Sequence, residues 1–441
     1  MSKARRGSPA ALPEPARGRR WTGMRRLLLT LLLLTMTLPA AGCWDKTELN
    51  ELAITSATGL DFKDGRWLVS FQVVIPQSIS NQSGSSSGAQ APVMVFSTEG
   101  ESIRGAVQRS SFEMPRALFF AHNRILIIGE EAARRGFSQM IDIYLRNPDS
   151  RETVSVYITQ GTAREVLEHL IPLEKIPGAA IGNLIKNEEL NGSNFQETRL
   201  YQMAMKMTGE AAAVVVPEIF ISGDNRQADS LDSLKRTVAG SKLKLNRVGI
   251  FKKDKFIGWM KRTDAYGLSW ITDSVKKTTF FFGCTKGDEH YQASLLINDS
   301  KTRRTPHIKE GRLSVDVKVR AKGTLMENNC TTDPSRLEGL RELEEIAAEE
   351  IKKRIMEAFR TGQQMKVDVF GFASLFHKEF PEQWRGLKDQ WEEQLAAMTL
   401  VPAVEVEIDR LGMSTKPFKK LLQTGNEGSQ PTRQETTTEG R

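Results

Sequence analysis

The sequence contains few of the residues that most often carry enzymatic chemistry. Its 441 residues include 3 cysteines and 5 histidines, and the histidines show no HExxH or other metal-ligand spacing. No P-loop or dinucleotide-binding glycine pattern is present. The Gly84–Gly88 segment fits G-x-S-x-G, but it lies in a Ser/Gly-rich stretch rather than at a strand-to-helix turn. We therefore predict no catalytic residues, no metal site and no cofactor, and we do not expect an enzyme. The histidines are His122, His169, His290, His307 and His377.

The sequence also lacks a hydrophobic run long enough for a permanent transmembrane helix. The uncharged stretch 27–42 is shorter than the roughly 20 residues that span a bilayer core. It follows an arginine-rich segment, which is the layout of a secretory signal. We predict a signal peptide over residues 1–42, and Met24 offers an alternative true start codon.

The signal ends in Ala40-Ala41-Gly42-Cys43, which resembles a bacterial lipobox. A lipobox usually has leucine where Ala40 stands, and here the nearest leucine is Leu38. We predict that Cys43 carries diacylglycerol and further acyl chains, because one chain alone binds a membrane only marginally. The alternative is an ordinary cleaved signal followed by an incidental cysteine.

The mature chain has almost no excess of basic residues. The whole sequence carries a net charge of +8, and the segment 1–26 contributes eight cations and one anion, or +7, which leaves about +1 from Cys43 onward. Nucleic-acid binding therefore loses its main electrostatic argument, and we predict no nucleic-acid partner. The eight cations are Lys3, Arg5, Arg6, Arg17, Arg19, Arg20, Arg25 and Arg26, and the anion is Glu14.

Cys284 and Cys330 are the other two thiols. In an exported chain they could form a disulfide, although two cysteines do not make a disulfide framework. A chain of this length does not need such a bond for stability, so the free thiols remain the alternative.

Strand and helix patterns alternate along the mature chain, which predicts a mixed α/β (α+β) fold with several domains, each a β-sheet with flanking helices. The first region, 43–225, reads as an N-terminal α/β region of two subdomains with a flexible Ser/Gly loop at 78–91. Its expected strands are 67–75, 93–96, 124–128 and 153–159, and its expected helices are 102–111, 130–145 and 163–170.

A polar stretch predicts a linker over 226–244 and a C-terminal α/β domain over 245–415. That domain is expected to open with a hairpin around 252–255, to contain a strand at 313–319, and to include one long helix near 334–361. Asp333 and Pro334 would start this helix as N-cap and first residue, and it would end near Gly362. The polar segment 416–441 is expected to be a disordered tail.

Several stretches in the mature chain resemble one family, the Ger(x)C family of spore germination lipoproteins, the C subunits of nutrient germinant receptors. They occur in the family's order and span most of the chain. The stretches are Cys43–Ala53 with Gly59-Leu-Asp61, Arg116–His122 through Ile128-Gly-Glu130, Arg146-Asn-Pro-Asp149 with Arg151, Val248–Trp259, Asp368–Phe372, Phe380-Pro381 with Trp384, Trp391, and the closing strand through Gly412.

The resemblance implies a protein of about three domains on the outer face of the spore inner membrane, beside two membrane-embedded subunits. One such subunit has a large soluble part and the other is transporter-like, and together they sense nutrients and trigger germination. No catalytic residues carry over. The alternatives are a solute-binding lipoprotein of a transporter, with two similar lobes around a cleft, and a secreted hydrolase. The sequence does not identify ligand-binding residues.

Overall fold

The computed structural model describes residues 24–32, 48–80, 90–224, 229–288 and 290–410. Contacts divide the chain into two units, 1–52 and 53–441. In the first unit residues 24–32 form an exposed helix, and Leu49–Glu51 (η2) make one 3-10 turn. Across the described ranges we find no helix with the length and apolar character needed to traverse a bilayer. Cys43 and the predicted tail 416–441 lie outside these ranges.

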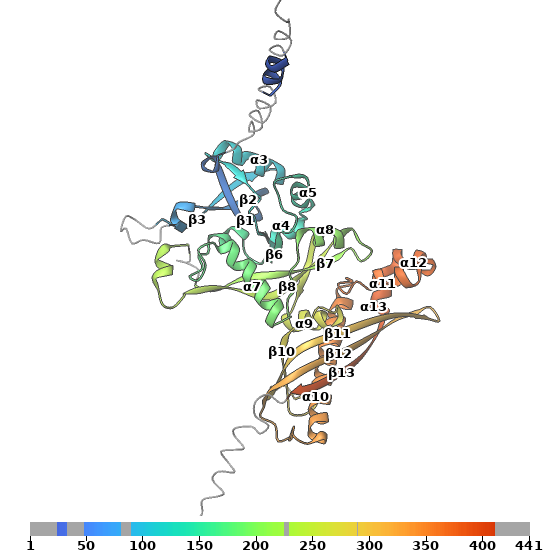
Figure 1. Cartoon of the computed structure of the whole chain (residues 1–441). Helices are drawn as coiled ribbons and strands as arrows, with labels where there is room; N and C mark the ends of the chain where they lie inside the picture. Colours follow the sequence, from blue (N-terminus) through green and yellow to red (C-terminus); the bar gives the residue numbers. More distant parts are fainter. Residues whose placement is uncertain (1–23, 33–47, 81–89, 225–228, 289, 411–441) are drawn as a thin grey trace, which may run out of the picture. The chain divides into compact units, whose positions relative to one another are not determined.

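A mixed nine-stranded sheet organises the N-terminal part of the second unit (Figure 1), in the order β3-β2-β1-β5-β6-β7-β8-β9 with β4 paired to β1. Its middle strands β1, β5, β6 and β7 are parallel, and the pairs at both ends are antiparallel. The strands are β1 Leu52–Lys63, β2 Arg66–Val74, β3 Val93–Gly100, β4 Ala117–Phe119, β5 Ile125–Gly129, β6 Ser155–Thr159, β7 Ala213–Gly223, β8 Ser241–Lys252 and β9 Lys255–Met260.

Helices cover both faces of this sheet. In β5 the side chains of Ile125 and Ile127 pack with one hydrophobic cluster, whereas Leu126 and Ile128 pack with a second cluster on the opposite face. A parallel strand buried on both faces reads as a continuous apolar run, which is the pattern of residues 125–128. The helices are α2 Pro76–Ser80, α3 Ile103–Glu113, α4 Glu130–Arg135, α5 Ser138–Arg146, α6 Ala163–Glu168, α7 Pro177–Asn191, α8 Leu200–Thr208 and the 3-10 helix η3 Leu231–Lys235.

A four-stranded sheet, β10-β11-β12-β13, forms the C-terminal part (Figure 1). Along β12 buried and exposed residues alternate, and α10 packs against β13 and α9. The elements are α9 Arg262–Ile271, β10 Thr278–Phe282, β11 Ala293–Lys309, β12 Arg312–Asn328, α10 Leu337–Gln364, α11 Phe372–Glu379, α12 Pro381–Leu387, η4 Lys388–Gln390, α13 Trp391–Ala397 and β13 Thr399–Arg410. The mixed α/β fold class predicted from the sequence is confirmed.

The helix expected over 130–145 is two helices, because Gly136 interrupts it at φ +101°, a conformation that residues with side chains rarely adopt. A Cβ at this position would lie 2.8 Å from Oδ2 of Asp254 in the β8–β9 turn. Glycine therefore allows the break to approach this turn closely.

The long C-terminal helix begins at Leu337 rather than Pro334, so the predicted start was wrong. Asp333 does not act as its N-cap: the carboxylate accepts a hydrogen bond from the Ser335 backbone N–H at 3.0 Å, in a turn before the helix. The helix ends at Gln364, close to the predicted end near Gly362. A Cβ at Gly362 would lie 2.5 Å from the Phe370 ring, so glycine permits this close packing.

The predicted domain boundaries remain predictions. The described strands bear on the boundary proposed at the linker 226–244. Strands β8 and β9 pair with β7 and so continue the first sheet, although they follow the proposed linker 226–244. The linker also overlaps the start of β8 at Ser241. Most of the predicted loop 78–91 lies outside the described residues, and its first residues, 78–80, belong to α2.

Candidate functional site

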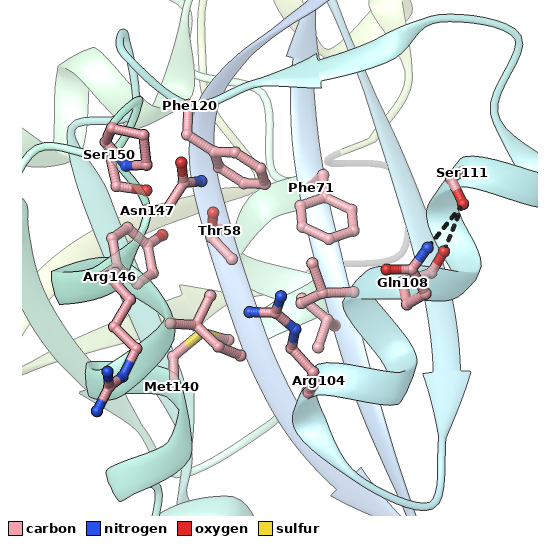
Figure 2. A pocket seen from close by; sticks show the side chains of 15 residues that line it. Thr58, Phe71, Arg104, Gln108, Ser111, Phe120, Met140, Arg146, Asn147 and Ser150 are labelled. Atoms are coloured by element: carbon pink, nitrogen blue, oxygen red, sulfur yellow. Dashed lines mark hydrogen bonds between the residues drawn. The ribbon is translucent and has the colours of Figure 1, made fainter.

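A pocket of about 440 Å³ opens on one side of the first sheet, between β1, β2, α3 and α5 (Figure 2). Its walls are mainly apolar and aromatic, which is typical of small-molecule sites. The apolar lining residues are Val69, Phe71, Val107, Phe120, Met140, Ile143 and Pro148. The polar lining residues are Thr58, Gln108, Ser111, Tyr144, Asn147 and Ser150.

The charged residues of the lining are both cations. Arg104 on α3 and Arg146 at the end of α5 line the pocket, and no aspartate or glutamate does. Arg146 pairs with Asp142 at 2.7 Å on an exposed helix face. The side chain of Arg104 makes no hydrogen bond or ion pair with any residue that the structure describes. Figure 2 shows its guanidinium directed toward the middle of the pocket.

A small buried polar cluster holds one wall of the pocket. The Asn123 side-chain amide donates to Thr58 Oγ1 at 3.0 Å and also to the Tyr144 hydroxyl. Burial raises the pKa of Tyr144, so its hydroxyl stays protonated. Asn123 Oδ1 is buried without a partner among the described residues. The wall is therefore polar but uncharged.

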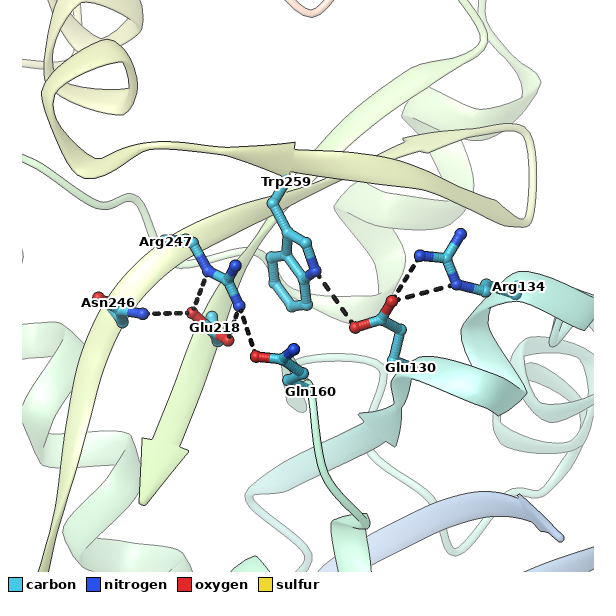
Figure 3. A network of polar contacts seen from close by, with 7 residues as sticks. All are labelled: Glu130, Arg134, Gln160, Glu218, Asn246, Arg247 and Trp259. Carbon is cyan, nitrogen blue, oxygen red and sulfur yellow. Dashed lines mark hydrogen bonds and ion pairs between the residues drawn. The ribbon is translucent and has the colours of Figure 1, made fainter. Parts of the chain in front are cut away.

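A second polar site joins the neighbouring strands β7, β8 and β9 of the first sheet to helix α4 (Figure 3). Glu218 on β7 is fully buried, and Arg247 on β8 donates to both of its carboxylate oxygens, at 2.7 and 2.9 Å. Asn246 donates to the same carboxylate at 3.0 Å. This bidentate contact raises the pKa of Arg247 and holds both charges in place.

The network continues through an aromatic residue. The Arg247 guanidinium lies 4.2 Å from the ring centroid of Trp259 on β9. The Trp259 indole N–H donates to Glu130 at 3.2 Å, and Arg134 in turn donates to Glu130 at 3.1 Å. The network thus joins the Ile128–Glu130 and Val248–Trp259 stretches, which are far apart in the sequence.

Asp61 makes a third polar contact in the interior of the fold, by capping the N-terminus of helix α6. Its carboxylate accepts from the backbone N–H groups of Ala163 at 2.7 Å and Arg164 at 3.1 Å. Gly129 leaves room for it, because a Cβ there would lie 2.2 Å from Asp61 Oδ1. Burial raises the pKa of Asp61 to about 6, against these two hydrogen bonds, which lower it.

We expect Asp61 to make the protein less stable as the pH rises. Between about pH 4 and 6 the folded state retains a proton that the unfolded state releases, so wild type loses stability as pH rises through this window. A shift from 3.8 to about 6 corresponds to about 3 kcal/mol. Asp61→Asn does not titrate. In urea unfolding, the wild-type minus Asp61→Asn difference should fall by about 3 kcal/mol between about pH 4 and pH 7.

Asp64→Asn, in the exposed turn after β1, is the matched control for this pH series. A wild-type minus Asp61→Asn difference that stayed constant over the same window would contradict the account of a buried, protonated carboxyl group.

The histidines do not gather into a site. His169 is buried with Nε2 3.0 Å from Ser241 Oγ, and His122 is exposed beside Phe119. Within the described ranges no group of three or more His, Cys, Asp or Glu residues could hold a metal ion. The Gly84–Gly88 segment and Cys43 fall outside those ranges, so the structure does not address the predicted lipid attachment.

Cys284 and Cys330 are joined by a disulfide, with Cα atoms 5.3 Å apart. The bond connects the segment after β10 to the segment after β12, and Cys330 lies in the core of the second sheet. Its formation in the exported chain remains a prediction.

Two family descriptions match the chain, one after the other. "Spore germination protein N-terminal domain" matches residues 45–221, and "Spore germination B3/ GerAC like, C-terminal" matches residues 246–412. The chain belongs to the Ger(x)C family of spore germination proteins.

Known Ger(x)C proteins align along nearly their full length. Spore germination protein KC of Bacillus subtilis (strain 168) is 26% identical over 402 residues, which cover 90% of this chain and 98% of the relative. Spore germination protein B3 of the same organism is 23% identical over 368 residues, covering 81% and 91%. The crystal structure of the GerBC protein aligns with a TM-score of 0.47 and 17% identity, covering 80% of this chain and 96% of that one.

The sequence stretches that resemble the Ger(x)C family coincide with the structural features above. Phe120 and Arg146–Pro148 line the pocket, and Asp61 and Gly129 meet at α6.

The stretch Asp368–Phe372 also contains a buried carboxylate. Asp368 is buried and accepts from the Phe372 and Ala373 backbone N–H groups and from the Trp391 indole. Burial raises the pKa of Asp368.

Sequence reasoning did not identify the Glu218–Arg247 pair or the pocket. A signal for Glu218 was present, because it is the single charge inside the apolar run 213–221. No comparable signal existed for the pocket, since its lining residues come from separate strands, helices and turns.

Proposed function

We propose that this chain is a lipid-anchored subunit of a spore nutrient germinant receptor and that it is needed for nutrient-triggered germination. The observation that carries the proposal is the match of both Ger(x)C regions, in order, over 45–221 and 246–412. Family relatives named as germination proteins cover the same span. In this role the chain acts without catalysis and without a cofactor.

The proposed anchor is diacylglycerol on Cys43, which would hold the body at the outer face of the spore inner membrane. Two membrane-embedded subunits, one with a large soluble part and one transporter-like, are the proposed partners. Contacts between the subunits would couple a ligand-induced change in the receptor to the opening of a channel that releases ions and dipicolinate. These contacts must differ between the receptor states, because a conformational signal requires such a difference.

Cys43→Ala tests the anchor. We expect the variant to lose acylation and to leave the membrane fraction, because no other apolar segment of the mature chain is long enough to retain it. Fractionation of spore lysates, with mass spectrometry of the mature N-terminus, measures this. Glu51→Ala, at an exposed position near the mature N-terminus, is the matched control and should remain membrane-bound. An acylated, membrane-bound Cys43→Ala protein would show that the lipid is attached elsewhere.

The solute-binding alternative predicts two similar lobes around a cleft. Within the described residues the two sheets differ in strand number and order, with nine strands in one and four in the other. The structure therefore gives no support to the two-lobed alternative.

A further inference from the structure

The pocket beside β1, β2, α3 and α5 has the chemistry of a site for a small organic anion. We propose that it binds a carboxylate with an apolar or aromatic body, and that Arg104 is the residue that recognises the carboxylate. This goes beyond the proposed receptor role and does not depend on it, because the binding is a property of this chain alone.

The shape and lining of the pocket favour the apolar body of such a ligand. Its volume of about 440 Å³ lies within the range of small-molecule sites. Phe71, Phe120 and Tyr144 provide aromatic surfaces, and Met140 and Val107 add further apolar surface. Aromatic rings offer large apolar area and favour edge or offset contacts with another ring. The walls therefore suit an aromatic or branched aliphatic group.

The charge of the lining selects an anion over a cation or a neutral molecule. Two arginines and no acidic residue line the pocket. A bound cation would meet unbalanced positive charge, whereas an anion would meet a cation already in place. Since the buried cluster of Thr58, Asn123 and Tyr144 carries no charge, it does not compensate Arg104.

Arg104 is the better placed of the two cations. Arg146 is already paired with Asp142, and its side chain is 75% exposed. Arg104 has no partner among the described residues and is directed into the pocket (Figure 2). A planar guanidinium matches a carboxylate through two parallel N–H···O bonds, so a free arginine at the mouth of an apolar pocket suits this group.

The test is calorimetric titration of the mature lipoprotein in phospholipid nanodiscs with 3-phenylpropanoate and with its neutral isostere 3-phenylpropanamide. Empty nanodiscs give the heat of partition into lipid. We expect saturable binding of the acid, and binding of the amide weaker by about tenfold, which is about 1.4 kcal/mol, because the neutral amide lacks the charge that strengthens a hydrogen bond to the guanidinium.

Two variants and a control test where the ligand binds. Arg104→Gln should weaken binding of the acid by about tenfold and leave binding of the amide unchanged. Arg109→Gln, on the same helix but outside the pocket, is the matched control and should alter neither. Val107→Trp should block both ligands by filling the cavity. Circular dichroism and thermal unfolding establish that each variant is folded.

Three results would overturn the proposal: no saturable binding of the acid, equal binding of acid and amide, or an Arg104→Gln protein that binds the acid like wild type. If Val107→Trp abolished binding while Arg104→Gln did not, the pocket would be apolar only, and the assignment of an anion would be wrong. None of these results bears on germination, which is measured separately in spores.

Discussion

Arg247→Met is expected to lower the free energy of unfolding by about 3 to 5 kcal/mol, because it leaves the carboxylate of Glu218 buried and without its cation. Glu218 is 0% exposed, and after the substitution Asn246 would be the one side chain among the described residues that still donates to its carboxylate. The change also removes the stack of Arg247 on Trp259. Chemical denaturation followed by far-UV circular dichroism measures the loss.

A second substitution separates the buried charge from the lost packing. Glu218→Gln added to Arg247→Met removes the uncompensated charge, so the double variant should recover most of the lost stability. Arg320→Met is the matched surface control: Arg320 and Glu405 are 79% and 74% exposed, and we expect a cost below about 1 kcal/mol. Equal losses for Arg247→Met and Arg320→Met would refute the importance of burial.

Loss of the disulfide is expected to lower the free energy of unfolding by about as much as Arg247→Met does. The bond closes a loop with a sequence separation of 46, for which the chain-entropy relation gives about 4 kcal/mol. We expect Cys284→Ala/Cys330→Ala to unfold at correspondingly lower denaturant concentration, and reductant to shift wild type toward the same midpoint. Reductant should leave the double variant unchanged.

The thiols of the exported protein provide an independent measurement for the disulfide. Alkylation under denaturing conditions without reductant, followed by mass spectrometry, should leave Cys284 and Cys330 unmodified. If both cysteines were alkylated, and if reductant had no effect on wild-type unfolding, the bond would be absent from the native protein.

Much of the fold could be predicted from local patterns. The apolar run at 125–128 indicated a buried strand, and β5 is a strand that is buried on both faces. The hairpin around Lys252–Lys255 was also visible, because two apolar segments flank a short polar turn. These features depend on neighbouring residues and therefore appear in the sequence.

Other features depend on contacts that the sequence pattern does not encode. The break at Gly136 follows from its approach to Asp254, which lies more than a hundred positions away. The membership of β8 in the first sheet follows from its pairing with β7 across a polar segment that reads as a linker. The start of α10 depends on the Asp333 carboxylate, which accepts from the Ser335 backbone N–H in a turn and therefore does not cap the helix.

The candidate sites divide in the same way. Asp61 lies in a stretch that resembles the Ger(x)C family, but its cap on α6 and the space beside Gly129 appear only in three dimensions. The pocket is formed where α3 and α5 lie over β1 and β2, so no single segment contains its signature.

The most direct test of the central claim is nutrient-triggered dipicolinate release from spores that lack this gene, compared with the same spores restored with the wild-type gene. We predict that deletion abolishes or strongly slows release in response to particular nutrients, and that restoration returns it. Release by a germinant that bypasses nutrient receptors should stay unchanged. Wild-type release from the deletion spores with every nutrient would contradict the assignment of this chain as a required receptor subunit.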